Sequence, residues 1–141
     1  MKKQILQNNA SAESDHMQVF TVVSGESDLR VCWILNSILG INLALFEDIQ
    51  IKSRTQTNNF RRYQFVSEDE FERYTLLVNR NNGNILIPEL KKIDYIFIIQ
   101  SQVSLNSLDT KIKQIKQHAD IIAFISINYK TVKSFNKIHL S

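Results

Sequence analysis

The feature that most constrains the fold of this chain is a repeated alternation of apolar and polar residues across its middle third. A period of two buries one side of a strand and leaves the other side wetter, as is typical of antiparallel strands. The alternation breaks once, at Leu77; its apolar members are Ile49 and Ile51, then Tyr63 and Phe65, then Tyr74, Leu76 and Val78. The middle of the chain is therefore predicted to form antiparallel strands.

A helix is predicted over residues 28–39. Ser27 is a suitable N-cap, and Gly40 followed by an apolar residue suits a Schellman-type stop. Apolar residues cover most of the helix surface, so we expect the helix to be largely buried and Trp33 to be part of the core. One face is formed by Leu29, Cys32, Leu35 and Leu39.

A second amphipathic helix is predicted after residue 105, with a basic polar side. Its apolar positions recur every three or four residues, at Leu105, Leu108, Ile112, Ile115 and Ala119. Residues 93–99 form the most continuously apolar stretch, which predicts a strand in the centre of the sheet. Residues 121–127 predict a further buried strand, so that the three elements form a compact βαβ-like unit.

The remaining turns and strands complete a fold prediction. Residues 18–23 predict the first strand, and Asn81, Asn82 and Gly83 predict a tight hairpin. The order is β-α-β-β-β-β-β-α-β, which indicates an α+β fold with a mixed, mainly antiparallel sheet and two main helices packed on one face. At 141 residues we expect a flexible tail over residues 1–16 and a single domain over residues 17–141, with residues 128–141 left open between helix and strand.

Composition and spacing exclude several classes of function. The net charge is +3, the chain has one cysteine and three glycines, and no apolar run approaches the roughly 20 residues that cross a bilayer. We therefore expect a cytoplasmic protein with no membrane segment, and neither a Walker loop nor a dinucleotide-binding fingerprint. His16, His118 and His139 lack the spacing of a metal site, so we expect no metal and no cofactor.

Candidate binding residues lie around one proline-containing loop and on the first helix. Glu89 and Asp94 could serve as an acid and a base if burial separated their pKa values, or they could accept hydrogen bonds from backbone amides near a helical turn and a strand start. The structural interpretation is favoured because no nucleophile or metal accompanies them. Tyr95 and Arg30, a cationic contact, complete the binding candidates, and no catalytic residue is predicted.

The stretch Ile87, Pro88, Glu89, Leu90, Lys91, Lys92, Ile93, Asp94, Tyr95 resembles the signature of the IPExxxVDY family. Ile93 stands where that family has valine, which a buried strand accepts readily. Residues 28–36, followed by Leu39 and Gly40, are similar to the early helix of the family. The resemblance covers about residues 19–127 and implies a bacterial protein and this domain outline; it implies no activity, substrate or cofactor.

The function most consistent with this pattern is a non-catalytic binding or interaction module with unknown partners. It could form a homo-oligomer through a strand edge or through the first helix. One alternative is a small-molecule-binding or enzymatic domain that uses the loop from Ile87 to Tyr95. A second, less favoured, is a weak nucleic-acid binder that uses the lysine-rich C-terminal third.

Overall fold

The computed structural model describes residues 16–102 and 105–140, in which a large sheet has layers on both faces. The sheet is six-stranded, in the order β2-β3-β4-β7-β1-β8, and each pair of neighbouring strands is antiparallel. The strands are β1 (Met17–Val23), β2 (Ala44–Lys52), β3 (Thr57–Val66), β4 (Glu72–Val78), β7 (Tyr95–Ser101) and β8 (Ala123–Ile127). The antiparallel prediction is confirmed.

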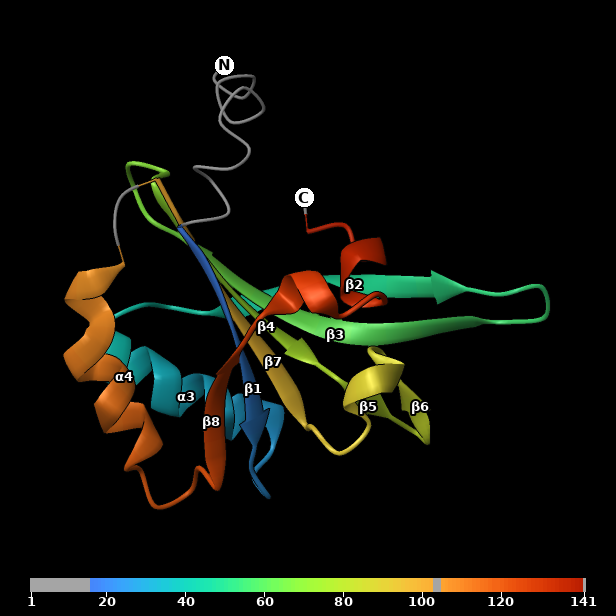
Figure 1. Ribbon diagram of the computed structural model, residues 1–141, viewed down its shortest axis with the longest axis horizontal. Helices are drawn as coiled ribbons and strands as arrows, with labels where there is room; N and C mark the ends of the chain where they lie inside the picture. Colours follow the sequence, from blue (N-terminus) through green and yellow to red (C-terminus); the bar gives the residue numbers. More distant parts are fainter. Residues whose placement is uncertain (1–15, 103–104, 141) are drawn as a thin grey trace.

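Both helices lie on the same face of the sheet, as predicted, and contact each other there (Figure 1). They are α3 (Asp28–Leu39) and α4 (Asp109–Lys116), the latter preceded by the 3-10 turn Asn106–Leu108. The Ser27 hydroxyl accepts a hydrogen bond from the Arg30 N–H at 3.2 Å. Gly40 ends α3 in the left-handed conformation with φ of 70°. The predicted N-cap and stop of this helix are both correct.

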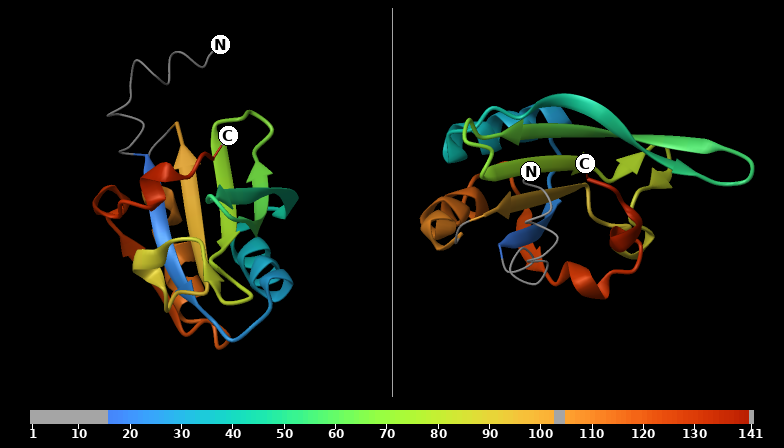
Figure 2. Two further views of the ribbon diagram at one scale, coloured as in Figure 1. Left: turned by 90° about the vertical axis from the view of Figure 1, so that its right-hand side faces the viewer. Right: turned by 90° about the horizontal axis from the view of Figure 1, so that it is seen from above.

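The opposite face is covered by irregular segments. A small hairpin of β5 (Arg80–Asn81) and β6 (Asn84–Ile85), the 3-10 turn Pro88–Leu90 and the C-terminal segment pack there (Figure 2). The C-terminal segment, which the sequence left open, contains the 3-10 turns Tyr129–Thr131 and Phe135–Lys137. This layer explains why the alternation breaks at Leu77, whose side chain is buried in the second core while its neighbours Leu76 and Val78 face the helices.

The predicted βαβ-like unit is present but split. β7 and β8 are both antiparallel to β1, so they run parallel to each other with β1 inserted between them. β7 is an interior strand: Tyr95, Phe97 and Ile99 face the helix side and Ile96 and Ile98 face the other. Burial on both faces is the physical reason for its continuous apolar sequence.

The hairpin of β2 and β3 extends beyond the rest of the sheet, on the side away from the helices (Figures 1 and 2). Between Phe46 and Ile49 the register of β2 against β3 shifts, as in a β-bulge. Bulges increase the local twist of an edge strand and discourage further strand pairing. The β5–β6 hairpin turns at Asn82 and Gly83, both with positive φ, which confirms the predicted tight turn.

The prediction for the outer face of α3 is corrected by the structure, and the prediction for the N-terminal tail falls almost wholly outside the described residues. Trp33 is 55% exposed and Leu29 is 68% exposed, so the outer face of α3 is open to solvent and the prediction of a largely buried helix was wrong there. Their side chains point away from the sheet because they lie opposite Val31 and Leu35 on the helix. The predicted flexible tail lies outside the described residues except for His16, whose carbonyl accepts a hydrogen bond from the Ser101 N–H at 3.0 Å.

Candidate functional site

The structure does not bring the four predicted binding residues into one site. Glu89 lies in the 3-10 turn Pro88–Leu90, and its carboxylate accepts a hydrogen bond from the backbone N–H of Ser134 in the C-terminal segment at 3.2 Å. Hydrogen bonding by the Ser134 side chain, with smaller contributions from this backbone bond and the positive charge of Lys137, lowers the pKa of Glu89. Glu89 thus ties the loop to the C-terminal segment, which agrees with the structural interpretation.

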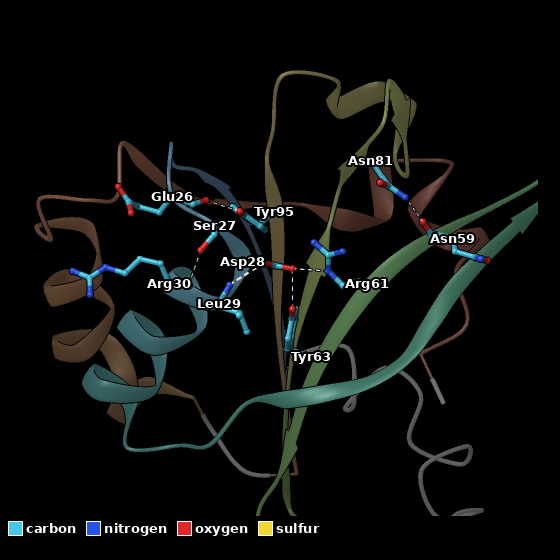
Figure 3. A network of polar contacts seen from close by, with 10 residues as sticks. All are labelled: Glu26, Ser27, Asp28, Leu29, Arg30, Asn59, Arg61, Tyr63, Asn81 and Tyr95. Carbon is cyan, nitrogen blue, oxygen red and sulfur yellow. Dashed lines mark hydrogen bonds and ion pairs between the residues drawn. The ribbon is translucent and has the colours of Figure 1, made fainter.

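Asp94 and Tyr95 both hold the turn between β1 and α3. The Asp94 carboxylate accepts a hydrogen bond from the Ser24 N–H at 3.1 Å. The Tyr95 hydroxyl donates to the Glu26 carbonyl at 2.6 Å, as Figure 3 shows. Burial, together with the negative charges of Asp28 and Asp94, raises the pKa of Tyr95 to about 12. The phenol therefore stays protonated at neutral pH and serves as a structural donor.

The Arg30 side chain lies on a different side of α3 from Asp94 and Tyr95. Its guanidinium pairs with the Asp120 carboxylate at 3.0 Å and lies over the Trp33 ring, 4.7 Å from the centroid. Both partners are partly exposed, so each contact contributes modestly to stability. The surface formed by Leu29, Arg30 and Trp33 is called the α3 surface below.

A polar cluster around Asp28 joins the start of α3 to β3 (Figure 3). One Asp28 oxygen accepts hydrogen bonds from Arg61 Nε at 2.7 Å and from the Tyr63 hydroxyl at 2.8 Å, and the other accepts one from the Leu29 N–H at 2.9 Å. Burial opposes the charged form, but the hydrogen bonds from Tyr63 and Arg61 outweigh it and lower the pKa of Asp28. An ionised carboxylate with three donors is a structural anchor rather than a base.

Cys32 lies one turn further along α3 and is 4% exposed. Burial, with a smaller contribution from the negative charge of Asp28, raises the pKa of its thiol to about 12. The thiolate that nucleophilic chemistry requires is therefore almost absent at neutral pH. Cys32 is a small residue of the core, in agreement with its place on the apolar face of the predicted helix.

Asn79 organises the loop from Ile87 to Tyr95, and sequence reasoning missed it. Its side chain is fully buried; the amide nitrogen donates to the carbonyls of Leu90 at 2.9 Å and Ile93 at 2.8 Å, and the amide oxygen accepts from the Ile87 N–H at 2.9 Å. A single asparagine therefore fixes both ends of the loop. No local pattern marks it, because its partners lie 8 to 14 residues further along the chain.

A hollow of about 460 Å³ lies beside this loop, between the β5–β6 hairpin and Lys91 and Lys92. Arg80 also lines it, so three cationic side chains surround the space, and the rest of the lining is residues 81–85. The two carboxylates of the loop, Glu89 and Asp94, are engaged with Ser134 and Ser24. The hollow therefore has a positive lining.

The lysines of the C-terminal third are divided between the two faces of the sheet. Lys111, Lys113 and Lys116 belong to α4 on the helix side, whereas Lys130 and Lys137 belong to the segment that covers the other face. A nucleic-acid backbone needs its cations along one continuous surface. This geometry does not favour the nucleic-acid interpretation.

Residues 16–102 and 105–140 contain no group of three or more histidine, cysteine, aspartate or glutamate side chains arranged to hold a metal ion. None of the helices in these ranges is both long enough and apolar enough to span a bilayer. No family model, no curated protein and no solved structure matches the chain.

Proposed function

We propose that this chain is a non-catalytic interaction module that binds a protein through the α3 surface. The supporting observation is that its single tryptophan is 55% exposed on a helix, next to Leu29 at 68% exposure. Leu29 and Trp33 are four residues apart, which makes them neighbours on a helix surface. Tryptophan and arginine are the residues most enriched among those that dominate binding energy at protein interfaces.

The first partner that this surface fits is a second copy of the chain. The charged residues of α3 are Asp28 and Arg30, and each is already paired within the chain, with Arg61 and Asp120. A two-fold contact would place the same surface of each copy together, so an unpaired charge would face the identical charge of the other copy. The α3 surface has no unpaired charge, and an isologous contact would bury Leu29 and Trp33 of both copies.

Analytical ultracentrifugation tests this proposal together with tryptophan fluorescence, since Trp33 is the sole indole. We expect the molar mass to rise toward twice that of the chain with concentration and the emission of Trp33 to shift to shorter wavelength in parallel. Trp33→Ser should abolish both the mass increase and, by removing the indole, the signal. Ile125→Ser is the matched control, because Ile125 is 56% exposed on the edge strand β8 and should leave association unchanged.

Two outcomes separate a second copy from another protein. A strictly monomeric chain with constant emission would exclude self-association at the α3 surface. A photo-crosslinking residue placed at position 33 in the source cells should then give a discrete protein adduct that the same residue at position 125 does not give. Absence of that difference as well would exclude the α3 surface as an interaction site. Trp33→Ser should lower the unfolding free energy by no more than about 1 kcal/mol, the scale of its exposed contact with Arg30.

The hollow beside the loop from Ile87 to Tyr95 favours a second candidate function, the binding of a small molecule. Glu89 and Asp94 take no part in it, since both carboxylates accept hydrogen bonds from backbone amides elsewhere. This second candidate function is therefore the binding of a small molecule, with no acid–base chemistry by Glu89 or Asp94. Membership in the IPExxxVDY family likewise stays a prediction, based on the resemblance of residues 87–95 and of residues 28–40.

A further inference from the structure

The hollow between the β5–β6 hairpin and residues 91 and 92 has walls that are held in place by hydrogen bonds, one of them buried. Asn79 holds the loop through three hydrogen bonds, and Arg80 Nη1 donates to the Lys91 carbonyl at 3.3 Å. The Asn81 side chain donates to the Asn59 carbonyl at 2.7 Å, which anchors the hairpin to β3 (Figure 3). A preformed site avoids the entropic cost of ordering its walls on binding.

The charged side chains that line this hollow are all positive. Arg80, Lys91 and Lys92 are exposed, and within the described part of the chain none of them forms an ion pair. The nearest carboxylates in the sequence, Glu89 and Asp94, are held elsewhere by Ser134 and Ser24. Cations gathered in a concave surface raise the local concentration of anions.

We propose that the hollow is a binding site for a small molecule that carries at least two phosphate groups. The hollow, at about 460 Å³, is within the range of small-molecule sites, roughly 300 to 1,000 Å³. A single phosphate carries a charge of about −1.5 to −2 at neutral pH, which is less than three cations can neutralise. Arginine provides a planar fork for phosphate oxygens, and the two lysines provide point charges.

This site is independent of the α3 surface. The hairpin and the loop pack on the face of the sheet opposite the helices, where Leu86 and Ile87 join the second core. Occupation of the hollow therefore does not require a protein partner on α3. Each proposal can fail without the other.

Isothermal titration calorimetry of the full chain with inorganic pyrophosphate and inorganic phosphate tests the proposal. We expect pyrophosphate to bind more tightly than phosphate and to remain bound at about 0.15 M salt, because a converging site is screened less than isolated surface charges. The double variant Lys91→Ala, Lys92→Ala should weaken pyrophosphate binding by about tenfold or more, equivalent to about 1.4 kcal/mol. It retains the Lys91 carbonyl that Arg80 contacts.

The matched control removes the same charge from the other side of the molecule. Lys111→Ala, Lys113→Ala changes two exposed lysines of α4 and should alter the affinity by less than about twofold, as expected for distant surface charges. Absence of binding heat, equal loss in both double variants, or disappearance of binding at physiological salt would overturn the proposal. Tighter binding of a single-stranded oligonucleotide that depends equally on both lysine pairs would also overturn it, because general charge attraction would then explain the binding.

Discussion

The side-chain oxygen of the fully buried Asn79 accepts a hydrogen bond from the backbone N–H of Ile87 at 2.9 Å. The same amide group donates to the carbonyls of Leu90 and Ile93. Three backbone groups of one loop are therefore satisfied by a single side chain that lies where β4 ends. The loop would otherwise carry buried polar groups without partners, which the interior of a protein does not tolerate cheaply.

Replacement of Asn79 should accordingly destabilise the whole chain. Asn79→Ala removes this partner from the Ile87 N–H and the Ile93 carbonyl, while the Leu90 carbonyl keeps its hydrogen bond from the Ile93 N–H. We therefore expect the unfolding free energy to fall by about 3 kcal/mol. Urea denaturation measures the change. Asn42→Ala is the control, since Asn42 is exposed, and it should leave the midpoint nearly unchanged. Equal midpoints for both variants would show that the loop does not depend on Asn79.

The contact between Asp28 and Arg61 predicts a pH-dependent stability. The pKa of Asp28 is lower in the folded chain than in the unfolded chain, despite its burial, because Tyr63 and Arg61 donate hydrogen bonds to the carboxylate. Its stabilising contribution is therefore complete above the unfolded value, near about 3.9, and is lost as the pH falls through the lower folded value.

The variant Asp28→Asn tests this contribution. At pH 7 it should lower the unfolding free energy by about 1–2 kcal/mol, and the difference from the natural chain should narrow below about pH 4. Thermal unfolding across a pH series measures both effects. The control Glu68→Gln removes one exposed carboxylate and should leave the unfolding free energy at pH 7 nearly unchanged. A constant difference between Asp28→Asn and the natural chain at every pH would contradict the assignment.

Cys32 should be chemically inert in the folded protein. Burial raises the pKa of its thiol to about 12, so the reactive thiolate is scarce at pH 8 and the sulfur is also inaccessible. We expect negligible reaction with a disulfide reagent under native conditions and full, rapid reaction in denaturant. Fast stoichiometric labelling of the folded chain would place the thiol in an open environment and contradict the structure.

The hairpin between β5 and β6 depends on a positive φ that only glycine adopts freely. Gly83 has φ of 84°, and an added Cβ would meet no neighbouring atom, so the cost of Gly83→Ala is a backbone cost of about 1 kcal/mol. Gly25 is the matched control: it too has open space around it, but its φ is outside the left-handed region. Gly25→Ala should be neutral or slightly stabilising, and calorimetry of the two variants makes the comparison.

Sequence reasoning recovered the local elements well where one pattern dominated. The N-cap at Ser27, the left-handed stop at Gly40 and the turn at Asn82 and Gly83 all depend on the chemistry of a few adjacent residues, and all three are present. Trp33 was misplaced because helical periodicity shows which residues share a side but not how wide a stripe the sheet covers. The contacts of the candidate sites could not be predicted, because no pattern in the sequence indicates the partners of Asp28 and Asn79.

The sequence by itself determined the α+β class, the antiparallel strands and the two helices on one face, because apolar periodicity and capping act over a few residues. Only the tertiary structure decided that β1 lies between β7 and β8, that the C-terminal segment covers the second face, and that Arg80 meets Lys91 and Lys92 around one hollow. These arrangements depend on contacts between segments distant along the chain. Their energies come from burial and hydrogen bonding after the chain has closed on itself, and no local pattern encodes them.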